Sequence, residues 1–406
     1  MRWLICAFLA LAWGCTASGS GRSPTPPLSL SPSPSVSSLP SPSPGRIAAP
    51  RTISLAAIQR LDPRLGFVTG WTGTGLGLAK TNDAGATWRR IAIPASRITT
   101  LRFIDDQAGW AGAFVERDVP QVACHQASPG AKPCRGVVLR TTDGGGTWQE
   151  VLSIVTNGVR GDPIRQLQAV DGQRAWVLAL AVEPCYAACP TELRRTTDGG
   201  KTWTTLLQGA ITAIRFASAT RGWLAITDPT GAVDVRVTSD GGATWEGSFH
   251  TATGAVVGLD AATAQIAWLM TQDGAYCTAS SCSNYELFRA VDGGWHWSSL
   301  GNPKGDGGSC TFGHLVGPLF ASVSRGWLAL NLGAGGLKGE PGGILATDDG
   351  GVTWQCMNTP PNTTLISAAD PLHVWATSQD QSAATTVYAT DDGGRTWHPL
   401  DLRSLR

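Results

Sequence analysis

The fold is decided by one short stretch, Thr196-Thr-Asp198-Gly-Gly200-Lys-Thr202-Trp203, and by its recurrence. The pattern Ser/Thr-x-Asp-x-Gly-x-Thr-Trp occurs seven times in the 406 residues, with its aspartates at Asp83, Asp143, Asp198, Asp240, Asp292, Asp349 and Asp392. The fifth copy departs from the pattern, because Ala290 replaces the first threonine and His296 replaces the second. A period of about 50 residues indicates a repeat architecture instead of several unrelated domains.

The motif has the chemistry of a tight turn between two strands. Its aspartate can accept hydrogen bonds from backbone N–H groups just ahead, and the glycine two positions on supplies the positive φ that such a turn needs. The tryptophan that follows is expected to start the next strand and to bury a large ring between neighbouring sheets. We interpret the seven aspartates as structural, because neither an active site nor a calcium site needs seven identical copies around a ring.

A second mark, a small residue followed by an aromatic one, precedes each turn. The aromatic residue is Phe67 in the first copy and tryptophan in the others, at Trp110, Trp176, Trp223, Trp268, Trp327 and Trp375. Each copy divides into four short strands, which we expect at 211–217, 223–227, 232–237 and 245–250 in the fourth copy. This pattern predicts an all-β, seven-bladed β-propeller with four antiparallel strands per blade and the motif turn between the third and fourth strands.

The motif resembles the Asp-box, or BNR, repeat, and the resemblance extends over residues 52–400. One Asp-box in every blade, with a Gly-Trp mark upstream, looks most like the photosystem II assembly and stability factor family and its bacterial relatives. That resemblance implies a scaffold. Sialidases and xyloglucanase-type glycoside hydrolases carry the same box, so the fold alone leaves the activity open.

Two segments precede the repeats. Residues 1–15 begin with a positive charge and an apolar run, and they resemble a bacterial signal peptide with a lipobox-like end at Cys15. We therefore expect export across the cytoplasmic membrane and a lipid anchor on Cys15 at the cell surface, with ordinary secretion or an uncleaved anchor as alternatives. Residues 16–51 are rich in Ser and Pro, which predicts a disordered, extended linker. The propeller is then expected to occupy residues 52–406.

Insertions interrupt two kinds of connection. The mark and the box aspartate are 16 or 17 residues apart in blades one, four and seven, but 33, 22, 24 and 22 apart in blades two, three, five and six. The box tryptophan and the next mark are 20 to 23 residues apart at four junctions, but 28 and 30 apart after blades two and five. Both connections emerge on one face of a propeller, and the Asp-box turns emerge on the other. We predict that the face with the insertions is the working face.

Eight of the ten cysteines lie beyond Cys6 and Cys15. An even number in an exported chain predicts disulfides, although eight cysteines allow 105 pairings. Local spacing favours three pairs that each close an inserted loop, and a fourth remains by elimination: Cys124–Cys134, Cys185–Cys189, Cys277–Cys282 and Cys310–Cys356. The positions of the last pair could hold its two residues too far apart. The six histidines are scattered, so we expect no metal and no cofactor.

The innermost strands offer a candidate binding site. Eight positions before the mark, blades two to seven carry Arg102, Gln168, Arg215, Asp260, Leu319 and Ser367. If the first strand of each blade lines the central tunnel, two arginines and an aspartate gather near its axis. They would form either an anion or carboxylate pocket or a hydrated ion-pair network without a ligand.

Composition limits the partners. A net charge of +1, with 15% charged residues and no basic run, argues against nucleic acid. We expect a monomer that contacts the membrane only through its lipid anchor and binds a protein partner or an extracellular glycan. The main hypothesis is a non-catalytic binding or assembly scaffold.

The alternative is a sialidase-like or other glycoside hydrolase, with sugar binding without catalysis as a third possibility. A sialidase would need a tyrosine nucleophile, and the chain offers Tyr186, Tyr276, Tyr285 and Tyr388. It contains no Arg-Ile-Pro motif, and no Gly-x-Ser-x-Gly signature is present.

Overall fold

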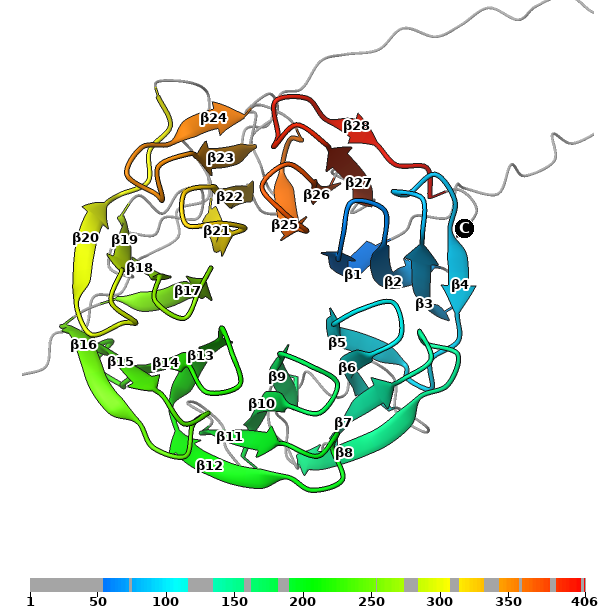
Figure 1. Ribbon diagram of the computed structural model, residues 1–406, viewed down its shortest axis with the longest axis horizontal. Helices are drawn as coiled ribbons and strands as arrows, with labels where there is room; N and C mark the ends of the chain where they lie inside the picture. Colours follow the sequence, from blue (N-terminus) through cyan, green and yellow to red (C-terminus); the bar gives the residue numbers. More distant parts are fainter. Residues whose placement is uncertain are drawn as a thin grey trace, which may run out of the picture. The chain divides into compact units, whose positions relative to one another are not determined.

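The computed structural model describes residues 54–72, 75–115, 134–156, 162–181, 190–252, 254–273, 284–306, 314–331, 343–357, 360–379, 385–402 and 405. They belong to one compact unit, Pro50–Arg406. Its strands form seven four-stranded antiparallel sheets, which are the blades of a ring (Figure 1). The predicted all-β, seven-bladed propeller is confirmed.

Each blade is built from four consecutive strands. The innermost strands are β1 (Ser54–Arg60), β5 (Arg97–Phe103), β9 (Ile164–Ala169), β13 (Ile211–Phe216), β17 (Ala255–Ala261), β21 (His314–Phe320) and β25 (Thr363–Ala368). The second strands are β2 (Gly66–Thr72), β6 (Gly109–Phe114), β10 (Ala175–Leu180), β14 (Gly222–Thr227), β18 (Ala267–Gln272), β22 (Gly326–Asn331) and β26 (Val374–Gln379).

The outer half of each blade follows the same order. The third strands are β3 (Gly75–Thr81), β7 (Cys134–Thr141), β11 (Thr191–Thr196), β15 (Val233–Thr238), β19 (Tyr285–Ala290), β23 (Ile344–Thr347) and β27 (Thr385–Thr390). The outermost strands are β4 (Arg89–Ile91), β8 (Gln149–Thr156), β12 (Thr204–Gly209), β16 (Glu246–Thr251), β20 (Trp297–Gly301), β24 (Gln355–Met357) and β28 (His398–Pro399). The four strands of blade four lie within one residue of the predicted limits.

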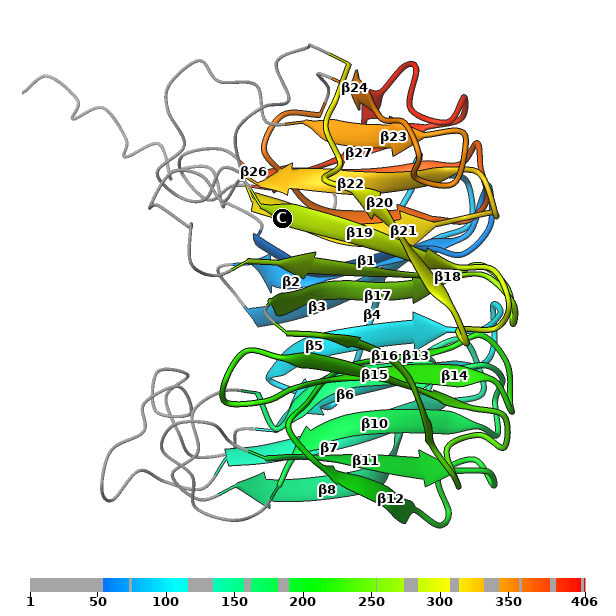
Figure 2. The same ribbon diagram turned by 90° about the vertical axis from the view of Figure 1, so that its left-hand side faces the viewer.

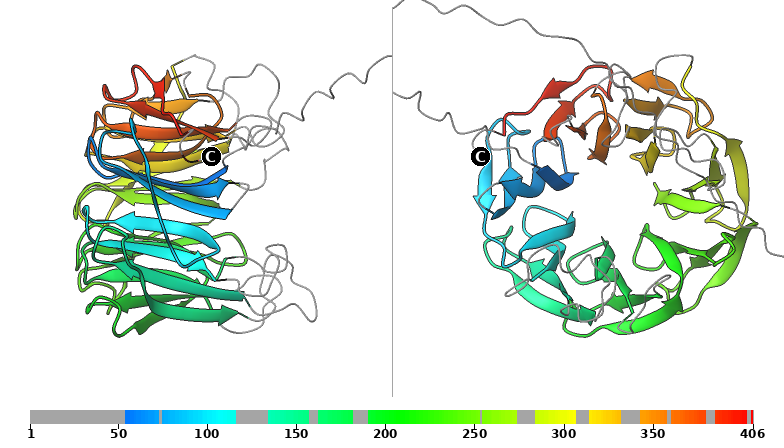
Figure 3. Two further views of the ribbon diagram at one scale, coloured as in Figure 1. Left: turned by 90° about the vertical axis from the view of Figure 1, so that its right-hand side faces the viewer. Right: turned by 180° about the vertical axis from the view of Figure 1, so that it is seen from behind.

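The ring has two different faces. The hairpin between the first and second strands and the Asp-box turn between the third and fourth strands lie on one face, which we call the turn face (Figures 2 and 3). The second-to-third connections and the links between blades lie at the opposite ends of the strands, on a face that we call the insertion face. In the part of the chain that the structure describes, no helix is long and apolar enough to cross a membrane.

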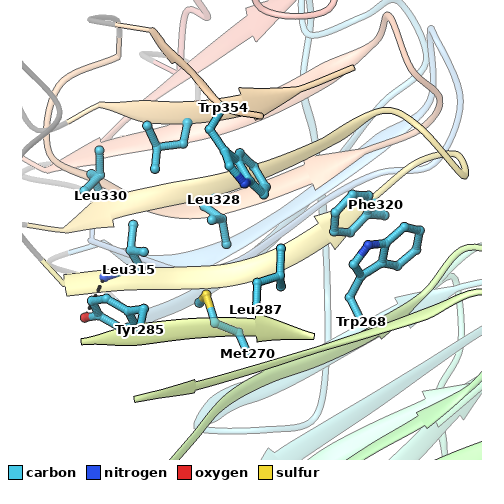
Figure 4. Close-up of a cluster of buried hydrophobic side chains, with 10 residues drawn as sticks. Trp268, Met270, Tyr285, Leu287, Leu315, Phe320, Leu328, Leu330 and Trp354 are labelled. Carbon is cyan, nitrogen blue, oxygen red and sulfur yellow. Dashed lines mark hydrogen bonds between the residues drawn. The ribbon is translucent and has the colours of Figure 1, made fainter. Parts of the chain in front are cut away.

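Aromatic rings fill the space between blades. The six mark tryptophans and Phe67 are fully buried. At three junctions the mark ring stacks on a phenylalanine from the inner strand of the next blade, with centroids 3.6 to 3.8 Å apart: Phe67 on Phe103, Trp176 on Phe216, and Trp268 on Phe320. Figure 4 shows the last of these stacks within the core between blades five and six.

The expectation for the box tryptophans was only partly right. Trp354 is buried, whereas the other six box tryptophans are half-buried. Trp148, Trp245 and Trp354 pack against the phenylalanine edges of these three stacks. The large rings that are fully buried between sheets are those of the upstream marks, because the mark lies on a second strand with a neighbour on each side, whereas the box tryptophan lies at the turn end of a blade's outer edge.

One set of hydrogen bonds holds the Asp-box turns. In blade three, Thr196 Oγ1 donates to Asp198 Oδ1 at 2.8 Å and accepts the Gly200 N–H at 2.9 Å. The Asp198 carboxylate also accepts the N–H and the hydroxyl of Thr202, at 3.0 and 2.7 Å. Gly200 has a φ of 86°, which explains the glycine. The same carboxylate bonds recur in blades one, two, four, six and seven.

The fifth turn reaches the same shape with other groups. His296 Nδ1 lies 2.6 Å from Asp292 Oδ2 and replaces the missing threonine hydroxyl. The Trp295 N–H donates to Asp292 Oδ1 at 2.9 Å. Ala290 has no hydroxyl, so this copy lacks both the bond to the aspartate and the bond from the second box glycine N–H that the first threonine makes in the other six.

In blades three, four and five the mark fastens its blade to the box turn of the next. The indole N–H donates to the carbonyl of the first box glycine at three consecutive junctions, from Trp176 to Gly241 at 2.9 Å, from Trp223 to Gly293 at 3.0 Å, and from Trp268 to Gly350 at 2.8 Å. The mark and the box are therefore two halves of one contact between blades.

A cation lies at every junction beside this contact. In blades one, two, three and five it is on the third strand opposite the mark, as Lys80, Arg140, Arg195 and Arg289. The corresponding residues in blades four, six and seven are Val237, Ala346 and Ala389, and there an arginine arrives from another strand end: Arg221, Arg325 and Arg60. Six of the seven donate to backbone carbonyls of the neighbouring blade.

Arg60 closes the ring between blade seven and blade one. Its guanidinium donates to the Thr390 carbonyl at 2.8 Å and pairs with Asp391 at 2.6 Å. The backbone N–H of Arg60 donates to Ser367 Oγ at 2.9 Å. Leu402 and Leu405, near the end of the chain, join the hydrophobic cluster between these two blades. Side chains, and not a shared strand, therefore join the first blade to the last.

Candidate functional site

The four tunnel candidates lie on inner strands, directly opposite the marks. Arg102 is paired in register with Trp110, and Asp260 is paired with Trp268. Gln168 and Arg215 occupy the same position in β9 and β13. The four inner strands that carry the candidates, β5, β9, β13 and β17, lie around the axis of the ring (Figure 1).

Arg215 and Asp260 form the centre of the group. Arg215 Nε lies 2.9 Å from Asp260 Oδ1, and Arg215 Nη2 donates to the Ala261 carbonyl at 3.1 Å. Arg215 Nη1 approaches Gln168 Oε1 at 3.5 Å, which is long for a hydrogen bond. Asp260 Oδ2 accepts the Phe320 N–H at 2.6 Å. Besides each other, both side chains therefore have a backbone partner in the next blade.

Burial and charge shift the pKa values of this group. Burial raises the pKa of Asp260, although Arg215 and the Phe320 N–H work against that rise. Arg102 is reached by water, yet protein atoms crowd it, and the lost hydration together with the charge of Arg215 lowers its pKa to about 10. Among the described residues, Arg102 has no hydrogen-bond or ion-pair partner. It is the free cation of the group.

The same ring position also joins blades, which sequence reasoning missed. Gln59, the blade-one member of the series, exchanges two hydrogen bonds with the backbone of Phe103, at 2.7 and 2.8 Å. Asp260, Arg215 and Ser367 likewise bond the backbone of the next blade. The spacing of eight residues before Phe67 would have found Gln59. For Arg215 and Asp260 the geometry matches the internal ion-pair network that we had kept as an alternative.

The group lies toward the turn face. Each candidate is the second-last residue of its inner strand, immediately before the first hairpin. The insertions continue from the other ends of the strands. The tunnel group and the predicted working face are therefore separated by the length of the inner strands.

Most predicted disulfide positions lie outside the described residues. Six of the eight cysteines are among the residues that the structure does not describe: Cys124, Cys185, Cys189, Cys277, Cys282 and Cys310. The side chain of Cys134 is not described either. The predicted signal peptide with Cys15 and the predicted linker, within residues 1–53, also lie outside the described residues. Cys356, in β24, is disulfide-bonded. The four pairings remain predictions.

The tyrosines required by a hydrolase are only partly described. Tyr285 is buried, and its hydroxyl accepts the Leu315 N–H at 3.0 Å (Figure 4). Burial raises its pKa, which disfavours the phenolate that a nucleophile needs. Tyr186 and Tyr276 lie outside the described residues. Within the described ranges, no group of three or more His, Cys, Asp or Glu could hold a metal ion.

Together, the sheets and the contacts between them define a seven-bladed β-propeller closed by side chains. No protein-family model matches the chain, and no curated protein sequence matches it either. Among solved structures it is similar to YCF48, a photosystem II assembly factor, solved bound to D1 peptide, with 18% identity and a TM-score of 0.53 over 84% of this chain and 92% of that one.

Two other solved propellers show the same kind of similarity. The β-propeller domain of the Trilobed protease from Pyrococcus furiosus has 9% identity and a TM-score of 0.55, with 86% of this chain and 98% of that domain covered. An ancestral GH74 enzyme has 11% identity and a TM-score of 0.51, and this chain covers 55% of its length. At these identities the likeness is one of fold, and it confirms the architecture that the Asp-box resemblance implied.

Proposed function

We propose that the chain is an exported, lipid-anchored, non-catalytic scaffold that holds a protein partner on its insertion face. The anchor is Cys15, the linker is residues 16–51, and the loops that grip the partner are those closed by the predicted disulfides. Loops constrained in this way lose less entropy when they bind.

One observation carries the proposal. Every departure from the minimal blade length begins at a strand end on the insertion face, whereas the turn face keeps one turn length in all seven blades. In a repeat scaffold the conserved geometry serves folding, and the variable connections are where binding surfaces arise. The similarity to YCF48, solved with a peptide bound, supports a protein as the partner class.

A glycoside hydrolase is less well supported. The likeness to a GH74 enzyme covers about half of that enzyme. The described Tyr285 hydroxyl is engaged with backbone. We expect no turnover of sialosides or plant glucans by the purified chain, and measured hydrolysis of either would overturn the non-catalytic assignment.

Blade four supplies the means to test the site. Its connection Asp228–Ala232 is a compact turn in which Asp228 Oδ1 accepts the N–H groups of Thr230 and Ala232, at 2.8 and 2.9 Å. In the test variant these five residues replace 115–135 of blade two, between the paired residues Phe114 and Gly136. We expect this graft to abolish crosslinked capture of the partner from native membranes while the unfolding temperature changes little.

The matched control makes the same graft where no insertion exists. Residues 380–384 of blade seven also number five, and they join the paired residues Gln379 and Thr385. Replacing them with Asp228–Ala232 should leave capture unchanged. Equal capture by both variants would remove blade two from the proposed site.

A further inference from the structure

The turn face is not uniform around the ring. Five large apolar side chains are exposed on it, and all belong to blades five, six and seven: Val291 (61% exposed), Trp295 (40%), Val323 (47%), Val352 (54%) and Leu372 (49%). We call these five residues the apolar turn patch. Among the described residues, the turn face of blades one to four exposes no large apolar side chain to this extent.

The other blades show that the fold does not require these residues. The turn position of Trp295 and Val352 is filled elsewhere by Ala86, Gly146, Lys201, Ala243 and Arg395. The position of Val291 is filled by Asn82, Thr142, Thr197, Ser239, Asp348 and Asp391. The hairpin position of Leu372 is filled by Arg64, Gln107, Gln173, Thr220, Gln265 and Ser324. Since small or polar residues form the same turns, turn formation does not explain the patch.

Contacts between the turns join the three blades that carry the patch. The Val323 carbonyl lies against Gly350, so the hairpin of blade six touches its own box turn. Trp268 of blade five donates to the Gly350 carbonyl, and Arg325 of blade six bonds the Gly393 carbonyl of blade seven. The five exposed apolar side chains are therefore concentrated on the turns of three adjoining blades, and clustered apolar exposure is what marks interaction surfaces.

The charges beside the patch indicate what covers it. Asp348 and Asp391 precede the box aspartates of blades six and seven, at a position that is uncharged in the other five blades. Their side chains are 65% and 53% exposed, whereas the arginines that pair with them, Arg325 and Arg60, are 9% and 1% exposed. The carboxylates therefore face outward and the cations lie beneath them. Trp295 adds a ring face that attracts cations.

We propose that the apolar turn patch binds a protein segment in which apolar side chains are flanked by Lys or Arg. Two other occupants fit less well. A second copy of the chain, docked by two-fold symmetry, would bring the same carboxylates together. An anionic lipid surface would be repelled by them. This surface is on the opposite side of the ring from the insertion face, so the inference does not depend on the function proposed above.

The test uses two synthetic 18-residue amphipathic helical peptides with the full chain. One peptide is built from Leu and Lys, and the other from Leu and Glu. We expect the Leu/Lys peptide to bind and to change the tryptophan fluorescence, and the Leu/Glu peptide to bind at least tenfold more weakly. No binding of the Leu/Lys peptide, or equal binding of both, would overturn the proposal.

The variants replace patch residues with the residues found at the same turn positions in other blades. The patch variant carries Val291→Thr, Trp295→Ala, Val323→Ala, Val352→Ala and Leu372→Gln, each a residue that the same turn already carries in another blade. It should bind the Leu/Lys peptide at least tenfold more weakly, as loss of a tryptophan anchor predicts. Trp295→Ala alone serves if the combined variant fails to fold. The control Thr142→Ala/Lys201→Ala changes the same turn positions in blades two and three and should bind as wild type does.

Three outcomes contradict the proposal. Undiminished binding by the patch variant places the peptide elsewhere. Dimerisation of the wild type that the patch variant abolishes, measured by sedimentation, assigns the patch to a second copy. Binding to phosphatidylglycerol vesicles that the patch variant abolishes assigns it to lipid.

Discussion

At the residue scale, the Asp-box aspartate is a hydrogen-bond acceptor that organises its turn. Its carboxylate is engaged by the hydroxyl and the backbone N–H of the second threonine, and by the hydroxyl of the first. The bond from the backbone N–H could be predicted from the sequence, because the residue types and their spacing match the turn chemistry, whereas the two hydroxyl bonds became evident only in the structure. The sequence did not reveal that His296 would replace a threonine hydroxyl, since an exposed histidine at that position has many rotamers.

We expect the same bonds to contribute to the stability of the fold in acid. Bonds from Thr202 lower the pKa of Asp198 to about 2, and Asp83, Asp143, Asp292 and Asp349 are also lowered to about 2. A carboxylate with a lowered folded pKa stabilises the fold fully above its ordinary pKa of 3.8 and loses that contribution as the pH falls toward 2. We expect the unfolding temperature to drop between pH 4 and pH 2.

Calorimetry across this pH range checks the expectation. Asp198→Asn should unfold at a lower temperature at pH 7 and lose less on acidification than wild type does. A wild-type unfolding temperature that is flat from pH 4 to pH 2 would show that the box carboxylates do not contribute in this way.

The fifth box offers a gain-of-stability prediction. Ala290→Thr should restore the missing acceptor for the Gly294 N–H and raise the free energy of unfolding by about 1 kcal/mol. Denaturant unfolding measures it. Ala290→Val is the matched control, because valine has the shape of threonine without the hydroxyl. If both variants gain equally, the hydroxyl is not the cause.

At the element scale, the strands could be predicted from the sequence because each repeat marks its own boundaries. In blade four the mark and the box predicted the limits of all four strands to within one residue. The contacts between blades could be predicted less well. The stacking residues Phe103, Phe216 and Phe320 each lie seven positions before the mark tryptophan of their own blade, so this spacing could have identified them. The seven junction cations could not be predicted as one set. Four of them lie on third strands, whereas Arg60, Arg221 and Arg325 reach the junction from the ends of other strands.

The ring closure depends on one such cation. Arg60→Gln removes the bonds to Thr390 and Asp391, and because Asp391 remains hydrated we expect a loss of about 2 kcal/mol in the free energy of unfolding. Urea unfolding measures the loss. Arg64→Gln, an exposed change on the neighbouring hairpin, should cost little, and equal losses would remove Arg60 from its closing role.

At the scale of the whole molecule, the ring separates folding from binding. The repeated glycine, aspartate and tryptophan positions build the turn face and the junctions, whereas the insertions begin at strand ends on the other face. The tunnel group illustrates the limit of sequence reasoning: its members could be placed around the axis, but only side-chain geometry distinguishes the paired Arg215 and Asp260 from the free Arg102.

The proposed anchor makes a separate prediction for the whole molecule. Cys15→Ser removes the thiol that would carry the lipid, so the protein should move from the membrane fraction to the soluble exported fraction, with an unchanged unfolding temperature. Immunoblotting of the fractions measures this. Membrane retention of the variant would favour an uncleaved anchor.

Crosslinking mass spectrometry on native membranes tests the central claim most directly, because it locates the partner residue by residue. The scaffold account predicts that in the wild type a bound protein crosslinks to the six long connections of the insertion face. These connections are β6–β7, β8–β9, β10–β11, β18–β19, β20–β21 and β22–β23. It also predicts that the blade-two graft loses the crosslinks to the β6–β7 connection. Crosslinks confined to the turn face, with none to any insertion, would contradict it.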